Sequence, residues 1–294
     1  MTGTLTGRTS VVAVFGYPVR HSLSPGMQNA AFRELNLDCV YVPFSISPED
    51  LPAALDAVRT LGMVGANLTI PHKERAVGLM DSVSDEAHRI GSVNTVHNVD
   101  GELRGYSTDG EGFMRALEAE GKSAEGSRAA LLGAGGSARA VAYALAARGA
   151  MVSVLNRTAI RGVDLVSELN GVLPEGRQSL RAVALNSPDA RREIAEADLL
   201  VNCTSVGMHP DTDKQPIPSE WMHDRLFVYD LIYNPLKTRL LDAAATAGAR
   251  TANGVGMLVH QGAISFEIWT GRKPPTDVME QAVLAGLEMM TAGR

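Results

Sequence analysis

Cysteine is scarce in this chain of 294 residues, which contains only Cys39 and Cys203. Two cysteines cannot build a disulfide framework, and neither belongs to a C-x-x-C pair. We therefore expect both to be reduced side chains that fill small buried spaces. The seven histidines show no ligand spacing with cysteine or acidic residues, so the sequence gives no indication of a metal site.

Long apolar runs and an excess of positive charge are also missing. The first apolar run, residues 11–15, is too short for the hydrophobic region of a signal peptide, and no later run approaches membrane-spanning length. The formal net charge is −6, which argues against nucleic acid or an anionic membrane as a partner. We expect a cytoplasmic protein, monomeric or homodimeric, whose partners are small molecules.

Residues 128–161 form the most informative stretch of the chain. Residues 129–132 are typical of a buried strand, an alanine-rich segment at 139–148 favours a helix, and residues 151–155 form a second strand. Between the first strand and the helix lies a G-x-G-x-x-A turn, made of Gly133, Ala134, Gly135, Gly136, Ser137 and Ala138. Glycine lets a phosphate approach backbone N–H groups and the positive end of a helix, so this unit predicts dinucleotide binding. The turn lacks the Walker lysine, which disfavours phosphoryl transfer.

The end of the second strand indicates which dinucleotide is bound. An NAD site usually has Asp or Glu there, whereas this chain has Asn156, Arg157 and Thr158, followed by Arg161. A guanidinium matches the oxygens of a 2′-phosphate, so the pattern favours NADP. The alternative is that Arg157 and Arg161 are solvated surface charges.

The amino-terminal half places polar side chains after its first strand, predicted at residues 11–16. Ser22 and Ser24 are two residues apart and can face one ligand while Leu23 points inward. Two hydroxyls at a strand end suit a polyhydroxylated ligand. The alternative is that Ser24, with Pro25, caps the helix predicted at residues 26–35.

A second group of polar residues lies in and directly after a strand predicted at residues 65–70, which ends before Pro71. Alternation puts Asn67 and Thr69 on one face, and Lys73 follows at the start of a helix predicted at residues 73–80. Asn94, in a strand at residues 92–96, can face the same rim. Asp109 lies in the first turn of a helix at residues 110–119, where the helix dipole favours its negative charge; it either accepts hydrogen bonds at this rim or only stabilises the helix.

Further strand ends supply candidates in the carboxyl-terminal half. Thr204 follows a strand at residues 199–202, at the edge where ligands bind in parallel sheets. Tyr233 ends a strand at residues 227–233. Gly254 lies in a glycine-marked turn that leads into a helix from Met257, with Gln261 one turn along.

These motifs, taken together, resemble the shikimate/quinate dehydrogenase family over nearly the whole chain. The matching segments are VFGYPV at 14–19 with SLSP at 22–25, NLTIPHKE at 67–74, SVNT at 92–95, STDG at 107–110, GAGGSAR at 133–139, NRT at 156–158 with Arg161, and GVGMLVHQ at 254–261. Two positions depart from the family: Tyr106-Ser107 stands where it commonly has Asp-Asn, and Gln28 where it commonly has His.

The resemblance implies an α/β protein of two domains. It predicts a substrate domain with a mostly parallel sheet at residues 1–108 plus 255–294, and a Rossmann-type NADP domain at residues 109–254. It implies hydride transfer between NADP and shikimate or 3-dehydroshikimate, in aromatic amino-acid biosynthesis. A quinate-using enzyme, or a non-catalytic NADP-binding sensor, stays open as an alternative.

The resemblance also assigns roles to residues. It implies that Lys73 and Asp109 are the catalytic pair, and alcohol oxidation indeed requires a group that takes a proton from the oxygen. It implies that the substrate is held by Ser22, Ser24, Asn67, Thr69, Asn94, Gln261 and, nearby, Tyr233. The implied cofactor residues are the turn at 133–138, then Asn156, Arg157, Thr158 and Arg161, with Thr204, Gly254 and Met257.

Overall fold

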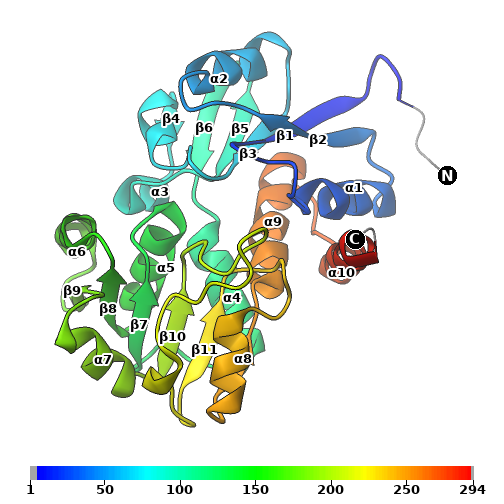
Figure 1. Cartoon of the computed structure of the whole chain (residues 1–294). Helices are drawn as coiled ribbons and strands as arrows, with labels where there is room; N and C mark the ends of the chain where they lie inside the picture. Colours follow the sequence, from blue (N-terminus) through cyan, green and yellow to red (C-terminus); the bar gives the residue numbers. More distant parts are fainter. Residues whose placement is uncertain (1–4, 293–294) are drawn as a thin grey trace. The chain divides into compact units, whose positions relative to one another are not determined.

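The structure is a computed structural model that describes residues 5–292. Its contacts divide the chain into two compact units, Met1–Gly112 with Leu258–Arg294, and Phe113–Met257. The sequence places the domain boundaries after residues 108 and 254. The contacts change inside α4 (Asp109–Ala119) and α9 (Val255–Thr270), two helices that continue without a break through these points. Each unit is α/β, as the sequence predicts (Figure 1).

The first unit contains a six-stranded sheet of order β2-β1-β3-β5-β6-β4. Its strands are β1 (Ser10–Gly16), β2 (Cys39–Ser45), β3 (Gly65–Leu68), β4 (Ser82–Val83), β5 (Thr95–Val99) and β6 (Glu102–Tyr106). Strands β2, β1 and β3 are parallel, whereas β5 runs antiparallel to both β3 and β6. Strand β2 lies at the edge of the sheet. Pro43 fits this position, because proline has no N–H to donate to a second neighbouring strand.

Helices cover both faces of this sheet. They are α1 (Ser24–Glu34), α2 (Leu51–Thr60), the 3-10 helix η1 (Arg75–Leu79), α3 (Asp85–Ile90), α9 and α10 (Thr276–Ala292). Leu55 and Val58 of α2 pack with Phe15 and Val96 of the sheet on one face. On the other face Phe32 of α1 stacks on the α9 ring of Phe266, with ring centroids 5.2 Å apart. Burial of these side chains is the main stabilising term for the unit.

Several local expectations are wrong. The strand predicted at 92–96 begins only at Thr95, so Asn94 lies in the loop before β5. The predicted helix at 73–80 is the short 3-10 helix η1, because Pro71 and the loop after it delay its start. The strand predicted at 65–70 ends at Leu68, and Ile70 beyond it is 62% exposed. Cys39 begins an edge strand and Cys203 follows a strand, so both free cysteines are half-buried. Burial still raises the pKa of the Cys39 thiol to about 11.

The second unit contains a six-stranded sheet of order β12-β11-β10-β7-β8-β9, in which all neighbouring strands are parallel. Figure 1 shows β8, β7, β10 and β11 side by side in this order. The strands are β7 (Arg128–Leu132), β8 (Met151–Asn156), β9 (Leu180–Ala184), β10 (Leu199–Asn202), β11 (Phe227–Asp230) and β12 (Arg250–Ala252). The order reverses beside β7, since the chain adds β8 and β9 on one side and β10 to β12 on the other. In open parallel sheets this switch point forms the ligand crevice, at the carboxyl ends of the strands.

Helices also cover this second sheet on both faces. They are α5 (Gly136–Ala147), α6 (Ala159–Val172), α7 (Pro188–Ala195) and α8 (Arg239–Thr246), with the 3-10 helix η2 (Ser219–Trp221). Ile194 of α7 and Leu241 of α8 share an apolar cluster with Leu132, Leu200 and Val228 of the strands. Helix α5 contacts β7 and β8, and most of its residues are buried, as its alanine-rich sequence allows.

Candidate active site

Two side chains of opposite charge meet in the first unit. Lys73 lies between β3 and η1, and Asp109 is the first residue of α4. The Nζ atom of Lys73 is 2.5 Å from Oδ2 of Asp109, and the two side chains are 12% and 4% exposed. The Coulomb attraction between two charges that water screens so little is stronger than that of an ion pair on the surface. The fold thus brings together the two residues that the family resemblance implies as the catalytic pair.

Asn94 holds the other side of the Asp109 carboxylate. Its Nδ2 donates to Asp109 Oδ1 at 2.9 Å and lies 3.3 Å from Oε1 of Gln261, a residue of α9. Its Oδ1 accepts from the backbone N–H of Thr108 at 2.8 Å. Lys73, Asn94, Asp109 and Gln261 are therefore one hydrogen-bonded cluster, although they are spread over residues 73–261.

Asn67 adjoins this cluster from β3. Its Nδ2 donates to the backbone oxygen of Asn94 at 3.0 Å, and its side chain is almost fully buried. Ser22 and Thr69 lie in the loops after β1 and β3, and Ser24 is the first residue of α1. All three are half-buried, and in residues 5–292 no hydrogen bond joins them to the cluster. The N-cap of α1 is Leu23 without a side-chain bond, so Ser24 does not cap this helix and its hydroxyl can serve a ligand.

Sequence reasoning missed a group of buried hydroxyls behind the cluster. Ser265 Oγ lies 2.7 Å from Thr95 Oγ1 and 3.3 Å from Thr108 Oγ1. It also donates to the backbone oxygen of Gln261 at 3.0 Å. All three hydroxyl residues are at most 2% exposed. The one available signal was the position of Ser265 one helical turn beyond Gln261.

His72 anchors the loop that carries Lys73. The ring is 1% exposed, and its Nε2 lies 3.0 Å from the backbone oxygen of Ile46. Burial lowers the pKa of His72, the nearby Arg75 lowers it further, and the hydrogen bond to Ile46 opposes them. A neutral ring that donates from Nε2 fits this contact. His72 therefore ties the start of the Lys73 segment to the end of β2.

The glycine turn of the second unit lies at the switch point of its sheet. Gly133 follows β7 with φ +111°, a conformation that favours glycine. A Cβ at this residue would lie 3.2 Å from Cγ2 of Thr204 and 3.3 Å from the oxygen of Cys203, at the end of β10. The two loops at the switch point are therefore in contact, with Thr204 beside the turn.

The start of α5 has the features that a bound pyrophosphate requires. The helix begins at Gly136, its N-cap is Gly135, and no side chain caps it. A Cβ at Gly135 would meet nothing within 4 Å, so packing within the protein does not demand glycine there. A glycine there leaves room for a phosphate to approach the backbone of the turn closely. The residues at 133–138 therefore fit a dinucleotide.

The predicted 2′-phosphate residues follow β8. Asn156 ends the strand, and its Nδ2 donates to the backbone oxygen of Thr158 at 2.8 Å, which shapes the turn into α6. Thr158 is the N-cap of α6 and forms no side-chain cap. Arg157 and Arg161 flank it and are both exposed. Arg157 and Arg161 thus lie four residues apart in the sequence, on either side of the uncapped start of α6.

The remaining candidates of the second unit lie on neighbouring turns. The hydroxyl of Thr204 donates to Asn202 Oδ1 at 2.7 Å. Gly254 is tightly packed, since a Cβ there would overlap the backbone oxygen of Leu231. Met257 is buried at the start of α9, whereas Tyr233 is half-buried after β11.

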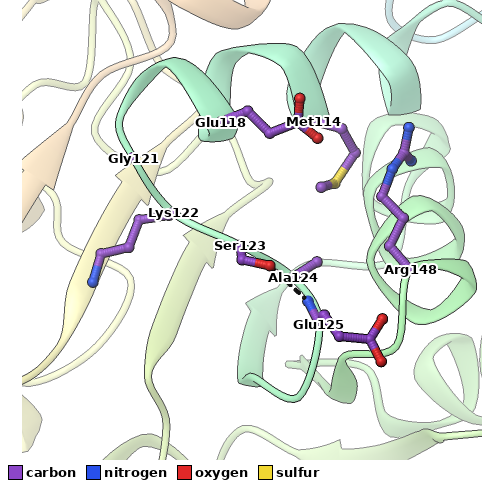
Figure 2. Close-up of a pocket in the computed structure, with 8 residues that line it drawn as sticks. All are labelled: Met114, Glu118, Gly121, Lys122, Ser123, Ala124, Glu125 and Arg148. Atoms are coloured by element: carbon purple, nitrogen blue, oxygen red, sulfur yellow. Dashed lines mark hydrogen bonds between the residues drawn. The ribbon is translucent and has the colours of Figure 1, made fainter.

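A surface pocket of about 450 Å³ lies elsewhere in the second unit (Figure 2). Its lining residues are Met114, Glu118, Gly121, Lys122, Ser123, Ala124, Glu125 and Arg148. The loop at 121–125 precedes β7, and Arg148 follows α5, so the pocket is at the amino end of the strand. The glycine turn is at the carboxyl end of β7, and the pocket is therefore separate from the predicted cofactor site.

Two kinds of feature are absent from residues 5–292. This part of the chain contains no group of three or more His, Cys, Asp or Glu side chains arranged for a metal ion. It also contains no helix long and apolar enough to cross a membrane.

Comparisons with known proteins extend these observations. Residues 14–96 match the family description "Shikimate dehydrogenase substrate binding domain", residues 116–217 match "Shikimate / quinate 5-dehydrogenase", and residues 254–284 match "Shikimate 5'-dehydrogenase C-terminal domain". Shikimate dehydrogenase (NADP(+)) of Methanopyrus kandleri is 48% identical over 282 residues, which cover 95% of this chain and 96% of that protein.

Solved structures agree with the sequence comparison. A crystal structure of shikimate dehydrogenase in complex with NADP+ has a TM-score of 0.90 and 39% identity, covering 97% of this chain and 98% of its own. The enzyme of Thermus thermophilus in complex with NADP(H) and shikimate has a TM-score of 0.85 and 42% identity, covering 95% and 100%.

The parallel sheet, with a glycine turn at its switch point, defines the second unit as a Rossmann-type dinucleotide-binding domain. The chain as a whole belongs to the shikimate dehydrogenase family. This confirms both the resemblance and the fold class that the sequence predicts.

Proposed function

We propose that the protein is an NADP-dependent dehydrogenase that interconverts shikimate and 3-dehydroshikimate. Membership of a family whose curated members are named shikimate dehydrogenase (NADP(+)) supports this function. The observation that carries the chemistry is the buried Lys73–Asp109 pair, 2.5 Å between Nζ and Oδ2. The family implies a role in aromatic amino-acid biosynthesis, in the cytoplasm.

Lys73 is the group that moves the proton in this proposal. In the oxidation direction the alcohol loses a hydride from carbon and a proton from oxygen, and the neutral amine of Lys73 accepts that proton. In the reduction direction its ammonium donates a proton to the carbonyl oxygen and stabilises the developing negative charge. A lysine with a mostly buried side chain suits this role because few water molecules compete for the same oxygen.

Asp109 orients Lys73 and stabilises its positive form. One carboxylate oxygen faces Nζ and the other accepts from Asn94, so the carboxylate cannot rotate without losing a hydrogen bond. Its place in the first turn of α4 adds the favourable field of the helix dipole. Asp109 is also close enough to Lys73 to accept a hydrogen bond from a substrate hydroxyl bound at the amine.

The substrate's remaining polar groups match the side chains around this pair. We assign its hydroxyls to amides and hydroxyls of the first unit, and its carboxylate to the serine loop; these residues are Ser22, Ser24, Asn67, Thr69, Asn94 and Gln261. The resemblance to the family also implies Tyr233 as a substrate residue. These side chains are uncharged and can form hydrogen bonds with the several hydroxyl groups of a cyclic polyol acid.

NADP supplies the nicotinamide carbon that accepts or gives up the hydride. The turn at 133–138 and the start of α5 would hold its pyrophosphate, and the open space at Gly135 supports this assignment. Asn156, Arg157, Thr158 and Arg161 would hold the 2′-phosphate. Thr204, Gly254 and Met257 would form part of the remaining surface for the cofactor.

The proposal is tested with purified enzyme by following NADPH absorbance with shikimate and NADP. We expect rapid NADPH formation, a much lower kcat/KM with NAD, and a lower kcat/KM with quinate. NADP binding without turnover of either acid would contradict the enzyme assignment and favour a sensor module. A higher kcat/KM with quinate than with shikimate would assign the protein to the quinate enzymes.

A further inference from the structure

A buried phenol lies behind the proposed substrate site, on the sheet of the first unit. Tyr41 of β2 is 1% exposed, and its ring lies 6.1 Å from the Trp269 ring, centroid to centroid. Its hydroxyl is 2.7 Å from Oδ1 of Asn67, two strands away across β1. This hydrogen bond joins two side chains, so it is not part of the backbone pairing of the strands.

The surroundings of Asn67 fix which end of its amide faces Tyr41. The backbone oxygen of Asn94, 3.0 Å from Nδ2, can only accept a hydrogen bond. A rotated amide would place Oδ1 against this oxygen, so Nδ2 must point toward Asn94. Oδ1 then faces Tyr41, and the phenol must be the donor.

Both N–H groups of the Asn67 amide are used inside the protein. Besides the Asn94 oxygen, Nδ2 has Thr95 Oγ1 and Ser265 Oγ at 3.1 Å each. The remaining capacity of the side chain is the second lone pair of Oδ1. Asn67 therefore offers a ligand an acceptor and no donor, which selects a hydroxyl and rejects a carbonyl or carboxylate oxygen at that point.

The same contacts connect Tyr41 to the catalytic pair. The backbone oxygen of Asn94 accepts from Asn67 and also from the N–H of Leu68 at 2.8 Å. The side chain of Asn94 in turn donates to Asp109 at 2.9 Å. A continuous path of hydrogen bonds thus runs from Tyr41 through Asn67 and Asn94 to Asp109 and Lys73.

We propose that Tyr41 is a positioning residue of this enzyme: its hydroxyl holds Asn67 as an acceptor for a substrate hydroxyl and holds Asn94 against Asp109. The inference rests on the proposed function, since it names how one substrate hydroxyl is selected. Tyr41 itself touches neither the substrate nor the cofactor and acts through Asn67.

The test compares Y41F, which removes only the hydroxyl, with V58A as a matched control. Val58 is a fully buried residue of α2 that packs on the opposite face of the same sheet, so V58A destabilises the unit without touching the path. We expect Y41F to lower kcat/KM for shikimate roughly 2- to 10-fold, the ratio for one net hydrogen bond, while the Kd of NADP is unchanged. V58A should lower the melting temperature and leave kcat/KM unchanged.

A double-mutant cycle shows whether the effect passes through Asn67. In an N67A background the additional loss caused by Y41F should disappear, because the group it orients is missing. Losses that multiply, or a Y41F enzyme that differs from wild type only in melting temperature, would overturn the inference.

A spectroscopic measurement keeps the inference separate from the proposed function. In NMR spectra of the ligand-free protein, the side-chain NH₂ signals of Asn67 and Asn94 should shift in Y41F and stay in place in V58A. Unchanged signals in Y41F would overturn the positioning role even if the wild-type enzyme is active on shikimate. If wild type fails to oxidise shikimate, the proposed function fails, and these signals still decide whether Tyr41 orients the two amides.

Discussion

The Asp230 carboxylate accepts a hydrogen bond from the Asn202 amide at 2.9 Å, and this bond joins the ends of the neighbouring strands β11 and β10. Its other oxygen accepts from Thr238 at 2.7 Å, at the start of α8. Asn202 also accepts from the hydroxyl of Thr204. Asp230 is fully buried and therefore holds together the loops that follow the two strands, beside the glycine turn.

This carboxylate predicts a pH dependence of stability. Burial raises the pKa of Asp230 from 3.8 to about 6, although hydrogen bonds from Thr238, Ile232 and Asn202 oppose the rise. The folded chain then binds the proton more tightly than the unfolded chain. The contribution of Asp230 to stability is thus fully present below pH about 4 and is lost as the pH rises through about 6.

The comparison of wild type with D230N isolates this term. Asn at this position keeps one acceptor for Asn202 and places an NH₂ group toward Thr238, whose hydroxyl can accept. We expect the free energy of unfolding of wild type, relative to D230N, to fall by up to about 3 kcal/mol between pH about 4 and 7. Urea unfolding at several pH values measures it; a constant difference would show that Asp230 does not titrate in this range.

The second prediction concerns the effect of replacing Gly133, in the proposed cofactor turn, on stability and NADP binding. G133A places a side chain at φ +111° and puts its Cβ 3.2 Å from Cγ2 of Thr204. We expect a loss of about 1–2 kcal/mol of stability from the backbone conformation and a further weakening of NADP binding, because the turn must move. The control is G121A, where φ is +70° but a Cβ would meet nothing within 4 Å. If G133A and G121A bind NADP with equal affinity, the turn at Gly133 does not take part in NADP binding.

Arg157 predicts a change in cofactor preference. R157Q should weaken NADP binding roughly 10- to 100-fold, the cost of a lost hydrogen bond to a charged group, and change NAD binding little. The Kd values of both cofactors, measured by protein fluorescence, test this. The control R177Q removes a half-buried arginine that pairs with Glu125. Equal losses for NADP and NAD in R157Q would mean that Arg157 does not read the 2′-phosphate.

Much of the fold could be predicted because its signals are local. The apolar run at 199–202 and the glycine turn at 133–138 specify a strand and its turn from adjacent residues alone. Short pieces escape such reasoning: β4 has two residues and β12 has three, and each is a strand only because a neighbour pairs with it.

The candidate site shows the same division. Lys73 and Asp109 are marked by their motifs, whereas the hydroxyls of Thr95 and Ser265 meet at 2.7 Å although 170 residues separate them. The role of Tyr41 likewise depends on a contact with Asn67 across an intervening strand. No pattern within a single segment reports such contacts, because they arise from the packing of α9 and three strands.

The central claim is that Lys73 transfers the proton, and kcat of the K73M variant tests it most directly. K214M is the matched control, since Lys214 forms an exposed ion pair with Asp211. We predict that K73M lowers kcat for shikimate oxidation by about 10²- to 10⁴-fold, with the Kd of NADP unchanged, and that K214M has wild-type kinetics. A K73M enzyme that folds normally and keeps the wild-type kcat would contradict the account.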